Sequence, residues 1–179
     1  TLGSLSKSLW GGLRVGWVRC PVGLVDQLVA ARIAMDLGSP VFEQLVAARL
    51  LAERESHWSA RRERLRAQRD ALAVALSERL PDWRFRLPRG GLSLWCELPD
   101  HHHAGALDLS AEAELRDVAI SAGPAFALDG GLDSFVRIPY TRPEDELRAA
   151  VDRIAGAWDA VTHGPAAAGT TRRTRVMVA

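Results

Sequence analysis

The sequence contains no asparagine, a single lysine and only two cysteines, Cys20 and Cys96. Two cysteines are too few for a disulfide scaffold, which favours a reducing, cytoplasmic compartment. No apolar run approaches the roughly 20 residues that a membrane-spanning helix needs, so we expect no membrane partner. Residues 1–4 are polar and lack a basic stretch, so we expect no signal peptide. A formal net charge of +1 gives no indication that the chain binds nucleic acid.

What remains is the composition of a globular protein. The chain is 47% hydrophobic and 25% charged, which excludes disorder of the whole chain. Its 179 residues suit one ordinary domain or half of a larger one.

The lone lysine, Lys7, stands against 22 arginines. A GC-rich genome favours arginine codons and explains the bias in general. Arginine can replace lysine on a surface or in an ion pair, but a guanidinium does not deprotonate and cannot act as a nucleophilic amine. Composition therefore leaves two readings of Lys7, a surface charge or a reactive amine, and the local sequence has to decide between them.

Apolar spacing and breaker residues predict the order strand, helix, long helix, two strands, helix, strand, helix. The predicted elements span residues 15–18, 22–35, 41–80, 83–87, 91–98, 110–121, 135–140 and 143–161. The first eight residues are predicted to be a loop. Strands and helices alternate in the second half, which favours an α/β layer with helices on one side.

Three other stretches are interpreted without a specific function. The charged segment 54–69 is typical of a solvated helix face with intrahelical ion pairs, and that is favoured over nucleic-acid binding. His101, His102 and His103 are adjacent and have no Cys, Asp or Glu at ligand spacing, so we expect a solvated loop and no metal site. The end of the chain, residues 163–179, is expected to be disordered.

Residues 4–17 carry the most chemical information. They offer one amine, three hydroxyl groups, a Gly-Gly turn and the guanidinium of Arg14. Hydroxyls, turn amides and an arginine suit a phosphate monoester, because they supply charge-assisted hydrogen bonds from several directions. A lysine beside such a cradle can form a Schiff base with a carbonyl on the same ligand. A small molecule with both groups is pyridoxal 5′-phosphate.

The spacing of this segment resembles the cofactor-lysine motif of the fold-type I aminotransferases, Ser-x-Ser-Lys followed by Gly-Leu-Arg-x-Gly-[Trp/Tyr]. It looks most similar to the aminotransferase-like domains of MocR-type regulators in the GntR group. By this resemblance, Lys7 would be the catalytic lysine that links the cofactor, and Ser4 and Arg14 would hold its phosphate. Ser6 is a further candidate for cofactor binding. A surface role is the alternative for Arg14.

The resemblance extends over about residues 1–160. The segments that carry it are 36–44, the His57 to Asp70 stretch of arginines, and Pro88-x-Gly-Gly-x-x-Leu-Trp. Phe135-Val136-Arg137-Ile138 resembles the strand whose arginine binds the substrate carboxylate. The alternative for Arg137 is an internal ion pair. Trp17 and Trp95 are expected to be packed in the core rather than to stack on the cofactor, and Cys96 is expected to be packed as well.

The resemblance implies a C-terminal portion of a fold-type I transferase. Residues 1–40 would end the large cofactor-binding domain, 41–80 would form a long interdomain helix, and 81–162 would form a small α/β domain. The family's partners for the pyridine nitrogen and the ring belong upstream of the lysine, and this chain has none of them. We therefore expect weak or no pyridoxal-phosphate binding by the chain alone.

Two functions follow from the resemblance. The first is the effector-binding domain of a MocR-type transcriptional regulator, which would bind an amino acid or an amine, form a homodimer and contact DNA only through a domain outside this chain. The second is part of a stand-alone pyridoxal-phosphate-dependent amino-acid aminotransferase. A plain interaction module without a cofactor is a third possibility that the residues leave open.

Overall fold

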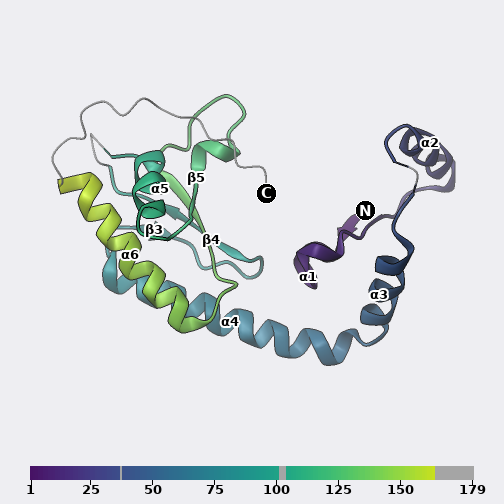
Figure 1. Cartoon of the computed structure of the whole chain (residues 1–179), viewed down its shortest axis with the longest axis horizontal. Helices are drawn as coiled ribbons and strands as arrows, with labels where there is room; N and C mark the ends of the chain where they lie inside the picture. Colours follow the sequence, from purple (N-terminus) through teal and green to yellow (C-terminus); the bar gives the residue numbers. More distant parts are fainter. Residues whose placement is uncertain (37, 101–103, 164–179) are drawn as a thin grey trace. The chain divides into compact units, whose positions relative to one another are not determined.

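The computed structural model describes residues 1–36, 38–100 and 104–163, with the side chains of 54–57 left out (Figure 1). The histidines 101–103 and all but the first residue of the predicted tail therefore lie outside the described residues. The chain divides into two compact units, with the boundary between Glu63 and Arg64. Each unit is described by itself.

The first unit begins with a hairpin. Strand β1 (Leu2–Ser4) pairs antiparallel with β2 (Gly16–Val18), and the short helices α1 (Leu5–Ser8) and η1 (Gly11–Leu13) lie between them in sequence. The prediction of a loop over the first eight residues is therefore wrong. Three residues are too few to show an alternating pattern, and pairing across the hairpin, rather than local sequence, creates β1.

Two apolar helices follow, α2 (Val22–Ile33) and α3 (Val41–Ala52). Helix α2 buries no residue at all, although it is rich in Val and Leu. The small core of this unit consists of Leu5, Leu13 and Ala47, with Ala47 from α3. A helix that is apolar on most sides is typical of a buried position, yet no described residue of its own unit covers the exposed apolar surface of α2.

The long stretch 41–80 is not one helix. It breaks at Glu53, which ends α3 with φ −99° and ψ 17°, and α4 (Arg54–Arg79) begins directly after it. Figure 1 draws α3 and α4 as two separate coiled ribbons. The prediction of one continuous helix is wrong: the sequence contains no Gly or Pro at the break, so nothing local indicates it. Helix α4 runs across the boundary between the two units.

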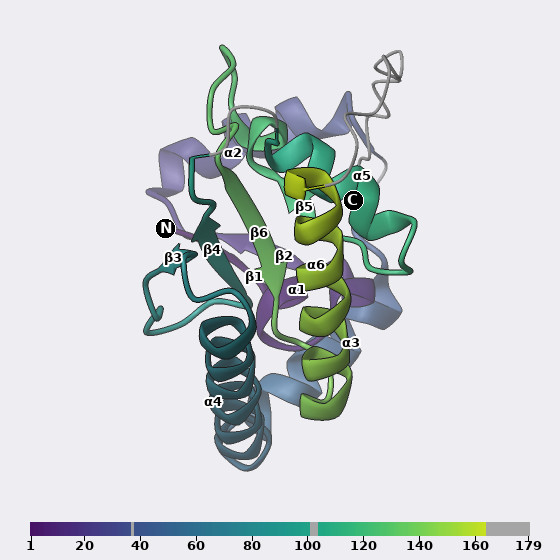
Figure 2. The same cartoon turned by 90° about the vertical axis from the view of Figure 1, so that its left-hand side faces the viewer.

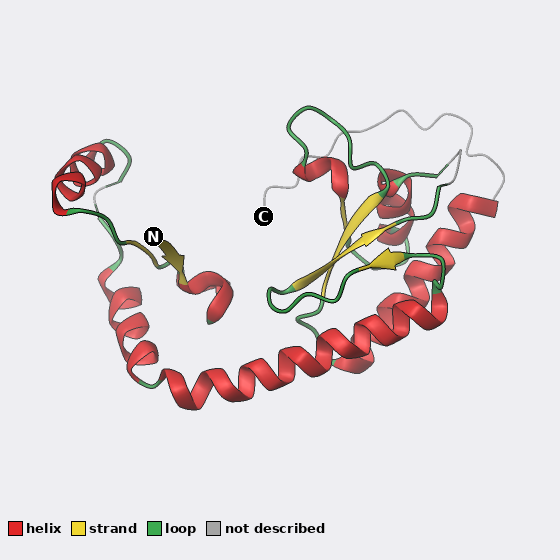
Figure 3. Ribbon diagram, turned by 180° about the vertical axis from the view of Figure 1, so that it is seen from behind, coloured by secondary structure: helices red, strands yellow, loops and turns green. Residues whose placement is uncertain are grey.

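The second unit contains a four-stranded antiparallel sheet in the order β3-β4-β6-β5 (Figure 3). The strands are β3 (Arg84–Phe85), β4 (Ser93–Glu97), β5 (Ser121–Ala122) and β6 (Phe135–Pro139). Three of them lie within the predicted ranges, and β5 was predicted as the end of a helix.

Helices cover only one face of this sheet. Leu94 and Cys96 of β4 and Val136 and Ile138 of β6 are buried, and they share one core with α4, α5 (Ala106–Glu114) and α6 (Glu144–His163). Figure 2 shows α6 lying along the sheet. The expected α/β layer with helices on one side is confirmed for this unit. None of the described α-helices of this unit covers the opposite face, and the alternate residues of β4 and β6 are not buried.

The helix predicted over 110–121 starts and ends too late. Helix α5 begins at Ala106, where the Asp108 carboxylate accepts a hydrogen bond of 3.0 Å from the Gly105 N–H. Ser110, the predicted first residue, lies inside the helix, and its hydroxyl donates to the Ile120 carbonyl oxygen at 2.9 Å. This capping interaction is a recognised signal for the start of a helix, and the prediction placed the start at Ser110 instead of Ala106.

Candidate functional site

Lys7 lies on the single turn α1, and Ser4 caps that turn. Ser4 has extended backbone angles, φ −147° and ψ 141°, and its hydroxyl oxygen accepts a hydrogen bond of 3.2 Å from the Ser6 N–H. The buried side chain of Leu5 anchors the turn. Lys7 is exposed, and within the described part of the chain its amine forms no ion pair.

Arg14 stands at the end of η1, in the left-handed region with φ 51° and ψ 26°. A non-glycine residue rarely adopts this conformation, which costs of the order of 1 kcal/mol. The backbone reverses here so that β2 can return beside β1. The guanidinium of Arg14 is exposed and is without an ion-pair partner among the described residues.

A backbone hydrogen bond brings the two ends of this segment together. The Leu5 N–H donates to the Val15 carbonyl oxygen at 3.0 Å, and Ser4 lies opposite Gly16 in the hairpin. Ser4 and Arg14, ten positions apart in sequence, are the chain neighbours of that bonded pair. The hairpin therefore places Ser4, Ser6, Lys7 and Arg14 around one short loop.

The hairpin also depends on a close approach at Gly3. The ring of Trp17, which lies opposite Gly3 in the ladder, covers this glycine so closely that a Cβ there would collide with it. Trp17 remains 49% exposed, so the prediction that it is a core residue is wrong. Its ring packs instead against Gly3 of its own hairpin.

Arg137 lies in the second unit, in the middle of β6. Its neighbours Val136 and Ile138 point into the core, so the alternation of the strand leaves Arg137 on the open face. No ion pair joins it to a carboxylate within residues 104–163 or the other described ranges. The structure therefore shows no internal ion pair of Arg137 among the described residues. Its Cζ lies instead 5.2 Å from the ring centroid of Phe126.

Two further aromatic side chains lie next to this pair. Trp95 of β4 meets Phe126 edge to face, with centroids 5.6 Å apart, and stacks on Phe135 at 5.7 Å. Trp95 is 36% exposed, so it is not the core residue that the sequence predicts. Cys96, one residue along, is fully buried, as expected. Burial raises the pKa of the Cys96 thiol to about 12.

Sequence reasoning missed Phe126 entirely. It belongs to a short 3-10 helix, η2 (Gly123–Phe126), and is separated from Arg137 by a loop. The one available signal was Gly123-Pro124, which the pattern interprets only as a helix breaker. The contact between Phe126 and Arg137 is decided by how that loop folds over β6.

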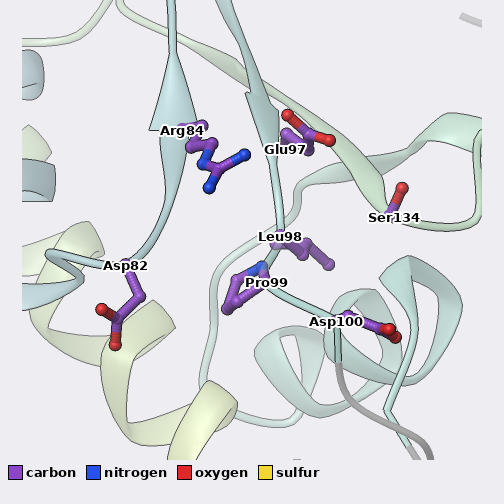
Figure 4. A pocket seen from close by; sticks show the side chains of 7 residues that line it. All are labelled: Asp82, Arg84, Glu97, Leu98, Pro99, Asp100 and Ser134. Carbon is purple, nitrogen blue, oxygen red and sulfur yellow. The ribbon is translucent and has the colours of Figure 1, made fainter.

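A second candidate is a surface pocket of about 410 Å³ near the start of β3 and the end of β4 (Figure 4). Its charged side chains are Asp82, Arg84, Glu97 and Asp100. None of the residues predicted for a site lines it. In the described part of the chain, no three His, Cys, Asp or Glu side chains are grouped closely enough to hold a metal ion.

None of the described helices is both long and apolar enough to cross a bilayer. Among the described residues, the hairpin around Lys7 and the open face around Arg137 each present a cationic group without an ion pair, the first beside hydroxyl groups and the second beside aromatic rings.

Comparison with known proteins gives a consistent pattern. Residues 1–154 match the family model described as aminotransferase class I and II. The chain is 33% identical over 159 residues to a 2-aminoadipate transaminase from Thermus thermophilus, covering 87% of this chain and 40% of that protein. It is 30% identical over 146 residues to the HTH-type transcriptional regulator YisV of Bacillus subtilis, covering 78% of this chain and 29% of the regulator.

Solved structures agree with the sequence matches. The chain superposes with a TM-score of 0.81 and 30% identity on an alpha-aminoadipate aminotransferase from Thermus thermophilus complexed with N-(5'-phosphopyridoxyl)-L-leucine. That match covers 89% of this chain and 41% of the aminotransferase. The chain thus spans about two fifths of the length of the aminotransferases that it matches. Transaminases and regulators occur among its relatives at similar identity.

Proposed function

The chain belongs to the class I and II aminotransferase family, and on that premise we propose that it is the C-terminal part of a pyridoxal-phosphate-binding domain that takes up an amino acid. The observation that carries the proposal is the hairpin that gathers Ser4, Lys7 and Arg14 around one loop. The cofactor, the ligand and the roles of these residues are proposals for the whole protein.

The polar side chains of the hairpin are of the types that bind a phosphorylated aldehyde. A phosphate monoester needs several hydrogen-bond donors and a positive charge, which the Ser4 hydroxyl and the Arg14 guanidinium supply. The left-handed backbone at Arg14 lets η1 turn directly into β2, and the Leu5–Val15 hydrogen bond holds Arg14 near Ser4. The Ser4 hydroxyl accepts from the Ser6 N–H, so its own proton remains available for donation. Ser6 offers a second hydroxyl on the same turn.

Lys7 supplies the primary amine of the loop. In our proposal its Nζ would hold the cofactor covalently and, as a free amine, would accept and return the proton at the α-carbon of the amino acid. Bound pyridoxal phosphate supplies an electron sink for that proton transfer. Arginine could not serve at this position, since its guanidinium does not lose a proton in proteins.

Arg137 would orient the ligand by binding its carboxylate. A guanidinium can donate two parallel hydrogen bonds to a carboxylate, and this one is exposed on the open face of the sheet. Lack of an internal carboxylate partner in the described chain supports this role.

We propose that the whole protein is a MocR-type regulator, in which amino-acid binding shifts the conformation of this domain and so the activity of a DNA-binding domain. The similarity to an HTH-type regulator supports this. The second candidate, a stand-alone aminotransferase, is supported by 33% identity to a transaminase. The full-length protein separates the two: a regulator binds operator DNA in an amino-acid-dependent way, whereas an enzyme releases a 2-oxo acid with steady turnover.

We also propose that the protein acts as a homodimer. The apolar side chains on α2 and α3 support an interface, since Val22, Ile33 and Phe42 are each at least 72% exposed. A single chain rarely leaves so many large apolar groups in water. Light scattering on the full-length protein should give the mass of a dimer, and a monomer would contradict this part of the proposal.

The test of the site uses Lys7→Ala and Lys7→Arg in the full-length protein loaded with pyridoxal phosphate. The wild-type protein should show an absorbance band near the visible edge, and borohydride should fix the cofactor to the peptide that contains Lys7. Both variants should lose the band and the adduct, although Lys7→Arg keeps the positive charge. A borohydride-reducible adduct that persists in Lys7→Ala would contradict the assignment.

A further inference from the structure

The open face of the sheet carries a row of side chains of which the proposed function uses only Arg137. In the antiparallel register, Trp95 of β4 and Ser121 of β5 both lie opposite Arg137 of β6. Residues directly opposite one another point to the same face, so the three form a continuous row across the sheet. Arg137 is the only charged member of that row and stands at its centre.

Phe126 lies over this row and meets the guanidinium directly. The distance of 5.2 Å from the Arg137 Cζ to the ring centroid is within the range of a cation–π contact. Such a contact restrains a long, flexible side chain without using its N–H donors, which point outward in the plane of the guanidinium. An ion pair with an internal carboxylate would restrain Arg137 as well, but it would also occupy those donors.

Phe126 is itself held in place by two features. The edge of Trp95 meets its ring, and Trp95 in turn stacks almost parallel on Phe135, with 15° between the ring planes. Behind it, η2 packs tightly on the start of β6: a Cβ at Gly123 would collide with the Leu132 carbonyl oxygen and lie 2.8 Å from the Phe135 carbonyl oxygen. Only glycine permits this approach.

From these contacts we propose that Phe126 is a positioning residue for Arg137, held by Trp95, and that it makes the site selective for ligands with a carboxylate over the corresponding amines. This inference rests on the proposed function, because it assumes that Arg137 faces the amino-acid ligand. It narrows the ligand class from amino acids or amines to amino acids. The physical reason is that Arg137 is oriented before the ligand arrives, so less side-chain freedom is lost on binding.

The first experiment tests the contact in the 179-residue chain without cofactor. The ring of Phe126 should shift the Arg137 side-chain NMR resonances upfield. Phe126→Leu keeps an apolar side chain but removes the ring, and it should return these resonances to ordinary values. Phe126→Tyr should preserve the shift. Leu128→Ala, in the same loop and fully exposed, is the matched control and should leave the spectrum unchanged.

The second experiment tests selectivity in the full-length protein loaded with pyridoxal phosphate. The spectral change on titration gives dissociation constants for an amino acid and for the amine that lacks its carboxylate. Phe126→Leu should lower the preference for the amino acid by about 2- to 5-fold, the range expected for an exposed cation–π contact. Phe126→Tyr and Leu128→Ala should retain the wild-type preference. A general loss of packing would weaken both ligands together and leave their ratio unchanged.

Each outcome decides the matter. Lost resonance shifts together with a reduced preference in Phe126→Leu support the inference. An unchanged preference in Phe126→Leu overturns it, even if the resonances move. A wild-type protein with no preference for the amino acid also overturns it, whereas the link between cofactor and Lys7 is judged separately by the borohydride adduct.

Discussion

Trp95 and Arg137 lie directly opposite each other on the paired strands β4 and β6, on the face of the sheet that none of the described α-helices of their unit covers. The next pair along the same strands, Cys96 and Val136, lies on the other face and is fully buried. The register between β4 and β6 thus decides which side chains enter the core and which lie on the open face. A one-residue slip in this pairing would exchange them.

The first prediction concerns Arg137→Lys in the full-length protein. Lysine keeps the charge but loses the planar fork, so amino-acid binding or turnover should weaken by ~1.5–3 kcal/mol, with cofactor binding nearly unchanged. The spectral titration with amino acids measures the loss. Arg142→Lys is the control, since Arg142 is an exposed arginine just beyond the same strand.

An internal structural role for Arg137 predicts the opposite combination. The melting temperature of Arg137→Lys would then fall while the amino-acid titration midpoint stayed the same. That result would remove Arg137 from the ligand site.

The second prediction is that the 179-residue chain alone binds pyridoxal phosphate weakly or not at all. It offers the phosphate donors and the amine, but the family's ring and pyridine contacts are absent from it. Each good polar or stacking contact contributes ~1–3 kcal/mol, so losing several should reduce affinity by orders of magnitude. Calorimetry that gave a micromolar or tighter dissociation constant would show that this segment is sufficient.

The third prediction concerns the loop that carries Phe126. Gly123→Ala places a methyl group against the backbone oxygens of Leu132 and Phe135, and should destabilise the second unit by ~1–3 kcal/mol. Gly90→Ala is the matched control, because a Cβ at Gly90 meets nothing within 4 Å. Urea unfolding of the two variants measures the difference. Equal midpoints would mean that the loop can move away from β6 at little cost.

The fourth prediction uses the two cysteines. Burial raises the pKa of the Cys96 thiol from its ordinary 9.0 to about 12, so at pH 8 it stays protonated and inaccessible. A thiol reagent should therefore modify Cys20, which is only partly buried, and leave Cys96 intact until the protein unfolds. Rapid reaction of both thiols in the native protein would contradict the burial of β4.

The same shift implies a pH dependence of stability. The folded state binds the Cys96 proton more tightly than the unfolded state does, so this contribution is fully present below pH 9 and is lost as the pH rises towards 12. Cys96→Ala should remove the part of the alkaline destabilisation that arises from this thiol. Identical slopes of the unfolding free energy against pH between 9 and 12 in both proteins would contradict this.

Local patterns were enough to predict the elements whose signal lies within one segment. The alternation of Phe135, Val136, Arg137 and Ile138 predicts β6 and the outward position of Arg137, because side chains alternate between the faces of any strand. The apolar periodicity of residues 143–161 predicts α6, which spans Glu144–His163. The grouping of Lys7 with Arg14 also follows from a spacing of only seven residues.

Features that depend on distant partners could not be predicted in this way. Strand β1 forms by pairing with β2 across the hairpin, and no Gly or Pro marks the break at Glu53. Trp95 is a large apolar residue of the kind usually found in a core, yet it lies on the open face. Side chains alternate along β4, and it is the next residue, Cys96, that points into the core.

The sequence by itself therefore determined the residue types of the candidate site, their local spacing and the strand or helix on which most of them lie. Only the tertiary structure decided that Phe126 meets Arg137, because this contact requires a tight approach of η2 to β6 across the intervening loop. The periodicity of apolar residues indicates on which face of its own helix or strand a side chain lies. It carries no information on which side chain from another element lies over that face, and this is set by the packing of the whole unit.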